Sequence, residues 1–228
     1  RAYTEMKVYD RNSVNTRNLT NSTETRTVYI DPVACGVLSD ADSTYTLSSG
    51  LASAGSCFSF SADGITLDGK GNTINFSQAS AGIGVNVTGA SRITIKDLTI
   101  TAGNLSLSNP TAILLNSTNN TIVNNVTIIM ANGTAVLIGS NANNNTLVNS
   151  TLDIRSGTSI GMAWSTIAPD DNLIYNNLLN ASLWVNVTTT GSKSNLWNTT
   201  KTAGRNIRGG GSLAGNYYAN STAGYSDT

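Results

Sequence analysis

A short apolar strand followed by a polar pair recurs along this chain at a nearly constant interval. The segments are ITLDG (65–69), ITIKDLTI (93–100), TIVNNVTI (121–128), TLVNSTLDI (146–154), LIYNNLLN (173–180) and NLWNTT (195–200). The apolar residues before the polar pair are Leu67, Ile95, Val123, Val148, Tyr175 and Trp197, which gives repeat lengths of 28, 28, 25, 27 and 22 residues. Such a period indicates a solenoid, because no single unit can bury its own apolar face.

The units are built from strands. A second short apolar run lies between the motifs, at 82–87, 112–115, 135–138, 159–162 and 183–187, and no helical periodicity is present. A β-sandwich would also offer short strands, but its apolar columns would not return at one fixed interval. We therefore predict an all-β fold, a parallel β-helix of about six rungs that spans roughly 25–30 Å at the usual interstrand distance.

Composition excludes several classes of function. Charged residues make up 11% of the chain and the formal net charge is zero, which argues against nucleic-acid binding and electrostatic membrane attachment. The chain has no histidine, which excludes His-based metal sites and Ser-His-Asp triads. No apolar run approaches the roughly 20 residues of a membrane span. No signal peptide is recognisable, and we expect any leader to precede Arg1.

The two ends of the chain differ from the repeats. Residues 1–34 carry nine of the 26 charged residues and contain two strand-like pieces, YTEMKVY (3–9) and RTVYI (26–30). We assign 1–34 to an N-terminal arm outside the solenoid, 35–205 to the β-helix and 206–228 to a Gly-rich cap or tail. Because an open strand edge recruits another chain, the arm either caps the coil or adds to the sheet of a neighbouring molecule.

Three stretches carry a resemblance to a known family. They are CGVLSDADSTYTLSSGLASAGSCFSFSADGITLDGKGNTI (35–74), the Asn-Asn motifs, and GGGSLAGNYYANSTAGYSDT (209–228). The chain resembles right-handed parallel β-helix proteins of the pectate-lyase-like superfamily, especially secreted archaeal-type relatives of the periplasmic copper-binding and carbohydrate-binding members. The family pattern is matched by Cys35, Tyr45, Leu47, Cys57, Leu67, Asp68, Gly69, Gly71 and Ile74.

The resemblance implies a Cys35–Cys57 bridge that closes the N-terminal end of the coil. From the residues alone, the two cysteines form either one disulfide in an oxidising compartment or two buried thiols. A copper site would call for His and Met, whereas the chain has no His and only Met6, Met130 and Met162. We therefore expect no copper binding and no other cofactor.

Asparagine has two competing roles. With Ser and Thr at 58 of 228 residues, chance would place about eight Asn-x-Ser/Thr sequons among the 30 asparagines, but the chain has fifteen, which indicates N-glycosylation. The sequons are at Asn18, Asn21, Asn75, Asn86, Asn104, Asn116, Asn119, Asn125, Asn132, Asn144, Asn149, Asn180, Asn186, Asn198 and Asn220.

The other role is a stacked column at the turns, where amides hydrogen-bond along the coil axis and Asn tolerates a left-handed backbone. The predicted column is Asp68, Lys96, Asn124, Asn149, Asn176 and Asn198. Asn124 and Asn176 lie in no sequon. Asn149 and Asn198 belong to both sets, and for them only one role can hold.

Candidate catalytic groups have simpler explanations. Ser159 in GTSIG would need a strand-to-helix turn and a His base, which this chain lacks. The best acid–base cluster is Asp68, Lys96 and Asp97; the sets Asp153/Arg155 and Asp170/Asp171/Lys193 are typical of ion pairs or turn caps. One acidic pair does not fill a calcium site. The aromatic residues of the C-terminal half fit core filling better than a sugar-binding platform; they are Trp164, Trp184, Trp197, Tyr175, Tyr217 and Tyr218.

We therefore predict a heavily N-glycosylated extracellular structural protein, without catalytic residues, that assembles with copies of itself into a cell-surface filament, sheath or lattice, in an archaeal setting. The alternative is a secreted carbohydrate-binding or polysaccharide-processing protein.

Overall fold

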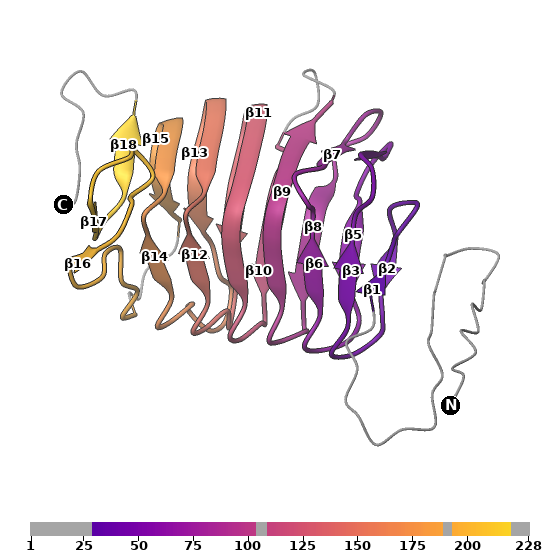
Figure 1. The fold of residues 1–228 in the computed structure, drawn as a ribbon, viewed down its shortest axis with the longest axis horizontal. Helices are drawn as coiled ribbons and strands as arrows, with labels where there is room; N and C mark the ends of the chain where they lie inside the picture. The colour runs from indigo at the N-terminus through magenta and orange to yellow at the C-terminus, as the bar shows by residue number, and fades with distance from the viewer. Residues whose placement is uncertain (1–28, 104–108, 189–192, 220–228) are drawn as a thin grey trace, which may run out of the picture.

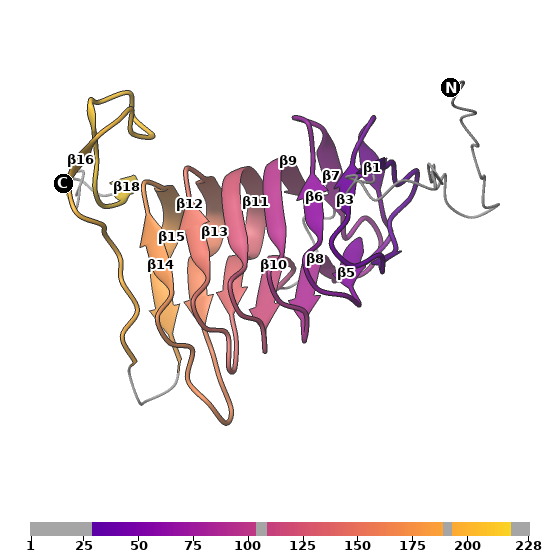
Figure 2. The ribbon, with the colours of Figure 1, turned by 60° about the horizontal axis from the view of Figure 1, so that its bottom comes forward.

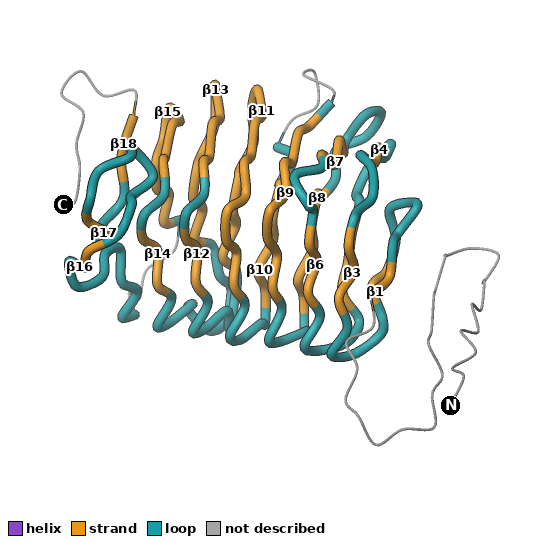
Figure 3. Tube along the Cα trace, viewed as in Figure 1, coloured by secondary structure: helices purple, strands orange, loops and turns teal. Residues whose placement is uncertain are grey.

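The computed structural model describes residues 29–103, 109–188 and 193–219, and these form one long coil of parallel strands (Figure 1). No helix occurs in the described residues, and therefore none that could span a membrane. Strands and short loops alternate along the coil (Figure 3). The predicted parallel β-helix of about six turns is confirmed. The arm up to residue 28, with its predicted intermolecular role, lies outside the described residues.

The strands stack into three sheets, called here faces A, B and C. Face A contains β1 (Tyr29–Ile30), β3 (Thr44–Thr46), β6 (Thr66–Asp68), the first part of β9 (Thr94–Ala102), the first part of β11 (Ile122–Ile138), β12 (Thr146–Val148) and β14 (Leu173–Tyr175). Face B contains β4 (Leu51–Ala52), β7 (Thr73–Phe76), the second part of β9, the middle of β11, the first parts of β13 (Thr151–Met162) and β15 (Leu178–Val187), and β18 (Tyr217–Ala219).

Face C contains β2 (Val37–Leu38), β5 (Phe58–Phe60), β8 (Ile83–Thr88), β10 (Thr111–Asn116) and the last parts of β11, β13 and β15. Every pairing in these faces is parallel. The hairpin of β16 (Thr202–Ala203) and β17 (Ser212–Leu213) is antiparallel and stands beside the coil at its C-terminal end (Figure 2). Parallel pairing thus extends from residue 29, inside the range assigned to the arm, to residue 219.

Alternation along each strand builds the core. On face A the inward column consists of Tyr45, Leu67, Ile95, Val123, Leu147 and Ile174, all buried. Outward positions hold β-branched residues, for example the stacked threonines Thr73, Thr99, Thr127 and Thr151 of face B. Such residues suit a pleated surface with close neighbours above and below.

Two of the apolar residues that precede the polar pairs in the sequence do not lie in this inward column. Val148 and Tyr175 lie in register with Asn124, one residue beyond the inward position that Leu147 and Ile174 fill. β12 and β14 are three residues long, and strand alternation turns their middle residue toward the core. Leu147 is followed by apolar Val148, and Ile174 lies between apolar Leu173 and Tyr175, so hydrophobicity alone did not fix the register.

A disulfide ties the first partial turn to the next. Cys35 and Cys57 are bonded, with their Cα atoms 4.6 Å apart. The pairing implied by the family resemblance is therefore present, and the alternative of two free thiols does not hold.

Candidate functional site

A polar groove runs along the corner between faces A and B. Its wider part has a volume of about 730 Å³ and is lined by corner residues of four successive turns, Asp97, Asn125, Asn149 and Asn176, and by the loop 205–209. Asp97 and Asn125 also line a neighbouring hollow of about 480 Å³, which reaches Asp68, Lys70 and Lys96. The two hollows adjoin at Asp97 and Asn125, and together they are called the groove here.

Left-handed backbone explains the residues chosen for this corner. Asp97, Asn125, Asn149 and Asn176 have φ values of 51°, 54°, 54° and 54°. Asn and Asp adopt this conformation more readily than other side-chain-bearing residues, because their short polar side chains bond locally to the backbone. Their stacked positions place polar side chains side by side at every turn.

One ion-pair cluster lies in the groove. Lys96 Nζ is 2.7 Å from Asp68 Oδ2 and 3.4 Å from Asp97 Oδ2. The predicted neighbourhood of these three residues is thus confirmed. Asp68 also accepts a hydrogen bond from the Lys70 backbone N–H at 2.9 Å, so its carboxylate is held on two sides.

The electrostatics keep both partners charged. Burial disfavours ionised Asp68, but hydrogen bonds from Lys96 and from the Lys70 N–H outweigh it, and the pKa of Asp68 is lower than its ordinary value. The hydrogen bond to Asp68 outweighs burial at Lys96 and raises the pKa of Lys96. A lysine held protonated is a poor general base, and a carboxylate held ionised is a poor general acid.

Amides line the groove beyond the ion pair. Asn149 Nδ2 donates to Asn124 Oδ1 at 2.8 Å, and Asn176 Nδ2 donates to Asn149 Oδ1 at 2.5 Å. The predicted ladder is confirmed for these three residues. It does not continue to Asn198: Asn176 Oδ1 accepts the Ile207 N–H instead, at 2.8 Å, because the loop of the β16–β17 hairpin enters the corner there.

That loop adds two cations to the groove. Arg205 and Arg208 line it, and the Arg208 guanidinium lies 4.6 Å from the centroid of the Tyr217 ring, in a cation–π contact. With Lys70 and Lys96, the groove holds four cationic side chains against the two carboxylates of Asp68 and Asp97, an excess of two positive charges.

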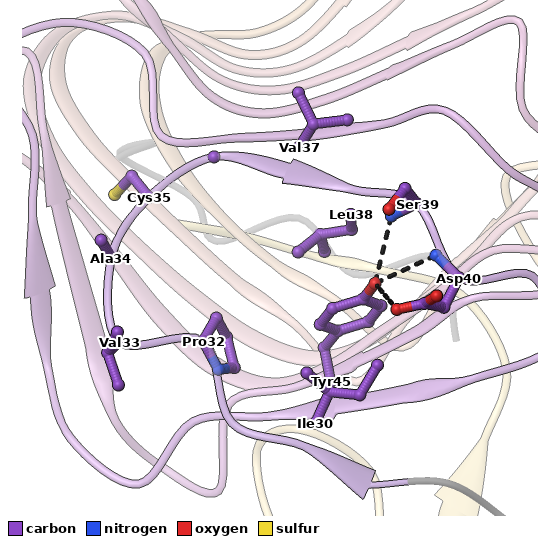
Figure 4. Close-up of a pocket in the computed structure, with 11 residues that line it drawn as sticks. Ile30, Pro32, Val33, Ala34, Cys35, Val37, Leu38, Ser39, Asp40 and Tyr45 are labelled. Atoms are coloured by element: carbon purple, nitrogen blue, oxygen red, sulfur yellow. Dashed lines mark hydrogen bonds between the residues drawn. The ribbon is translucent and has the colours of Figure 1, made fainter. Parts of the chain in front are cut away.

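A separate hollow of about 220 Å³ opens at the N-terminal end of the coil (Figure 4). Its walls are mostly apolar, from Ile30, Val33 and Leu38. Tyr45 spans it: its hydroxyl accepts the N–H groups of Ser39 and Asp40 at 3.1 and 3.0 Å and donates to the Asp40 carboxylate at 3.0 Å. The hollow is the end of the core, and the Tyr45 hydroxyl within it is fully hydrogen-bonded.

Sequence reasoning missed two buried amide ladders. In one, Asn145 donates its backbone and side-chain N–H groups to Asn172 Oδ1, both at 3.0 Å, and Asn172 donates likewise to Asn195 at 3.1 and 2.8 Å. In the other, Asn177 accepts the Ser150 N–H at 2.9 Å and donates to Asn216 Oδ1 at 3.0 Å. The signal was present in the Asn that recurs directly before the face A segment of each turn, at 145, 172 and 195.

The described sequon asparagines are separated from these ladders. Asn125, Asn144, Asn149 and Asn198 are exposed, and the others are half-buried: Asn75, Asn86, Asn116, Asn119, Asn132, Asn180 and Asn186. The buried asparagines belong to no sequon; they are Asn145, Asn172, Asn176, Asn177 and Asn216. The remaining sequons, Asn18, Asn21, Asn104 and Asn220, lie outside the described residues.

The other predicted candidates have structural roles. Trp184 packs against Tyr218, with ring centroids 5.2 Å apart, and donates its indole N–H to the Ala219 carbonyl at 2.8 Å. Ser159 is buried within β13, not at a turn. Asp170 accepts the Ser194 N–H at 2.8 Å and pairs with Lys193 at 3.6 Å, so its carboxylate caps a turn. Asp153 accepts a hydrogen bond from Asn180 Nδ2 at 2.8 Å.

Comparison with known proteins gives one match. A family described as periplasmic copper-binding protein (NosD) matches residues 5–223. No curated protein and no solved structure matches the chain significantly.

The residues present do not fit copper. Soft ligands are needed, but the chain has no His, both cysteines are in the disulfide, and Met130 and Met162 are buried in the core. Within 29–103, 109–188 and 193–219 no group of three His, Cys, Asp or Glu side chains could hold a metal ion. The fold and the family's periplasmic location agree with a secreted β-helix protein, and a match over residues 5–223 shows that the chain belongs to the NosD family.

Proposed function

We propose that this protein is an N-glycosylated structural component of the cell exterior, which associates with copies of itself into a filament, sheath or lattice on an archaeal cell surface. The division of the asparagines carries the proposal. Every described sequon asparagine is at least partly exposed, as glycan attachment requires, while every buried asparagine is outside a sequon and engaged in a ladder.

The sequons also have a preferred side. Asn75 and Asn180 lie on face B, Asn86 and Asn186 lie on face C, and no described face A strand contains a sequon asparagine. Glycans at these positions would cover faces B and C, while the exposed sequons Asn125, Asn144 and Asn149 lie at the corners that border face A.

Absence of catalysis is part of the proposal. The one acid–base cluster in the groove holds its lysine protonated and its carboxylate ionised near neutral pH, the opposite of what proton transfer requires. The protein should therefore release no product from polyuronates, measured as unsaturated or reducing ends.

The experiment is made on native material. Intact-glycopeptide mass spectrometry measures occupancy at each sequon, and electron microscopy of the same material shows whether it is polymeric. We expect ordered polymers and glycans at most exposed sequons except Asn149, whose amide belongs to the ladder. Unmodified sequons would refute the proposed glycosylation. Particles that stay monomeric at high concentration would refute the proposed self-assembly.

The groove supports a second candidate, a secreted carbohydrate-binding protein. Amides, four cations and two carboxylates along several turns suit an extended, polar, acidic chain. Binding to a panel of acidic and neutral glycans should then fall in Lys96→Ala and Arg208→Ala, while Trp184→Ala, whose ring packs away from the groove, serves as the control. The two functions exclude each other locally, because glycans on Asn125 or Asn149 would fill the groove.

A further inference from the structure

Face C ends differently from the other two faces at the C-terminal end of the coil. Face A is continued past β14 by Leu196, which bridges to Leu173, and face B is continued past β15 by β18. The second half of β15, Leu183–Val187, pairs only with β13 among the described strands. Its outer edge therefore presents a row of backbone N–H and C=O groups, the feature that recruits another strand.

The apolar column behind this edge is also uncovered. Leu115, Ile138, Met162 and Val187 lie in one column, in which the first three are buried and Val187 is 52% exposed. Val185 follows buried Ile160 in the parallel column. Within the described residues, these two inward positions, two residues apart, have no strand to cover them, which is a loss of buried apolar area at this end of the core.

The chain itself offers a strand of matching pattern. In YTEMKVY (3–9), Thr4, Met6 and Val8 fall on one side of a strand, and Tyr3, Glu5, Lys7 and Tyr9 fall on the other. Met6 and Val8 have the spacing of Val185 and Val187. The tail NSTAGYSDT (220–228) has no such alternation, and therefore suits this edge less well.

We propose that residues 3–9 of a second copy pair in parallel with Leu183–Val187, with Met6 covering Val185 and Val8 covering Val187. The inference rests on the proposed self-association and names its contact. Residues 10–28, which connect residues 3–9 to β1, could extend to roughly 60 Å. This length is enough for residues 3–9 of one copy to reach the face C edge of another. Because donor and acceptor lie at opposite ends of the chain, the contact is head-to-tail, and it builds an open filament as long as the rotation from copy to copy does not close into a ring.

The test uses Lys7 and Asn186, the outward-facing positions that lie between the pairs Met6–Val185 and Val8–Val187. The proposed register places Lys7 beside Asn186, where stacked Cα atoms on neighbouring turns come close enough for a disulfide, as at Cys35 and Cys57. Full-length Lys7→Cys and Asn186→Cys chains are mixed, oxidised and mapped by mass spectrometry; we expect mixed dimers joined at 7–186. The double variant should give a covalent ladder. Leu183→Cys with Lys7→Cys is the out-of-register control, with at least about tenfold less product.

Three further variants keep the test independent of folding and of glycans. Asn186→Gln removes the same sequon without a thiol and should assemble like the wild type. Val187→Glu places a charge at the open end of the column and should abolish polymers, whereas Val33→Glu, at an exposed position of the opposite end, should not. Polymers without a 7–186 bond would overturn this contact but leave self-association standing. A cross-linked monomer from the double variant would overturn the second copy as donor, and absence of polymers in the wild type would overturn both proposals.

Discussion

The corner between faces A and B is built differently in the two halves of the coil. In the N-terminal half it holds the charged cluster Asp68, Lys96 and Asp97, and a disulfide closes the nearby end. In the C-terminal half, asparagines take over, with the exposed ladder at Asn149 and the buried ladder of Asn177 and Asn216, while the other buried ladder, of Asn145 and Asn172, lies at the corner between faces C and A. Both the ion pairs and the amide ladders provide hydrogen-bond partners for polar groups at the tight turns, which no helix covers in the described part of the coil.

The difference teaches why asparagine is the residue that repeats. An amide both donates and accepts, so identical side chains can bond one to the next without limit along the axis. Charged side chains cannot be stacked in that way, because like charges on adjacent rungs repel. Positive and negative residues have to alternate from rung to rung, so an ionic column stays short. The amide half should therefore be insensitive to pH and salt, and the ionic half should respond to both.

The largest expected effect comes from breaking a buried ladder. Asn177→Ala removes the partner of the Ser150 N–H and of the Leu147 and Tyr175 carbonyls, all inside the coil. Unpaired buried polar groups should lower the free energy of unfolding by about 3–5 kcal/mol in urea titrations of unglycosylated protein. Exposed Asn198→Ala is the matched control, with a change within about 0.5 kcal/mol. A loss below about 1 kcal/mol at Asn177 would show that the ladder is incidental.

Loss of the disulfide should have the second-largest effect on stability. The bridge closes a loop of 22 residues, so Cys35→Ala with Cys57→Ala should destabilise the protein by about 3 kcal/mol on loop-entropy grounds. Because each turn of a solenoid contacts only its neighbours, faster hydrogen exchange should be confined to the first turns. Reduction of the wild type supplies the control, and exchange that rises equally in the C-terminal turns would contradict the separation of the two halves.

The exposed ladder should matter less. Asn149→Ala removes both ladder bonds and places Ala at a φ of 54°, for about 1–2 kcal/mol in thermal unfolding. Asn149→Gly also removes the bonds but suits the backbone, so it should recover about 1 kcal/mol. Equal losses in the two variants would mean that backbone conformation does not explain asparagine at this corner.

The ion pair should have the smallest effect. The lowered pKa of Asp68 stabilises the fold above the pKa of the unfolded chain, and this contribution disappears as pH falls through the folded pKa. The raised pKa of Lys96 contributes below its unfolded pKa and is lost only in strong alkali. With Lys96 34% exposed, solvent screening limits the pair to about 1 kcal/mol or less. Asp68→Asn should therefore flatten the acid limb of stability measured between pH 2 and 7, and an unchanged acid limb would rule out Asp68 as its source.

Much of the fold was predictable from the sequence, since the repeat interval and the alternation of Val, Ile, Leu and Thr specify a coil of short parallel strands. The inward position was predictable at Leu67 and Ile95, where polar residues flank it on both sides. At Val148 and Tyr175 the neighbouring residues Leu147 and Ile174 are equally apolar, so the inward one is undefined until the neighbouring rung is in place.

The site was predictable in part. Asp68, Lys96 and Asp97 lie one repeat apart or adjacent, so their cluster follows from the period. The presence of Arg205 and Arg208 in the groove could not be predicted from the repeat, because a hairpin outside the repeat brings them there. The buried ladders were missed for another reason: sequons drew attention to asparagines that face solvent, whereas Asn145 and Asn172 precede the motif and point inward.

The central claim is that buried amides hold the C-terminal turns together. Site-resolved hydrogen exchange at pH 4 and pH 7 tests it at the backbone N–H groups that donate to ladder side chains, those of Asn145, Ser150, Asn172 and Asn177. After correction for intrinsic rates, we predict protection equal to that of the central strands at both pH values. Exchange as fast as at the exposed loop residue Gly209, at either pH, would contradict the account.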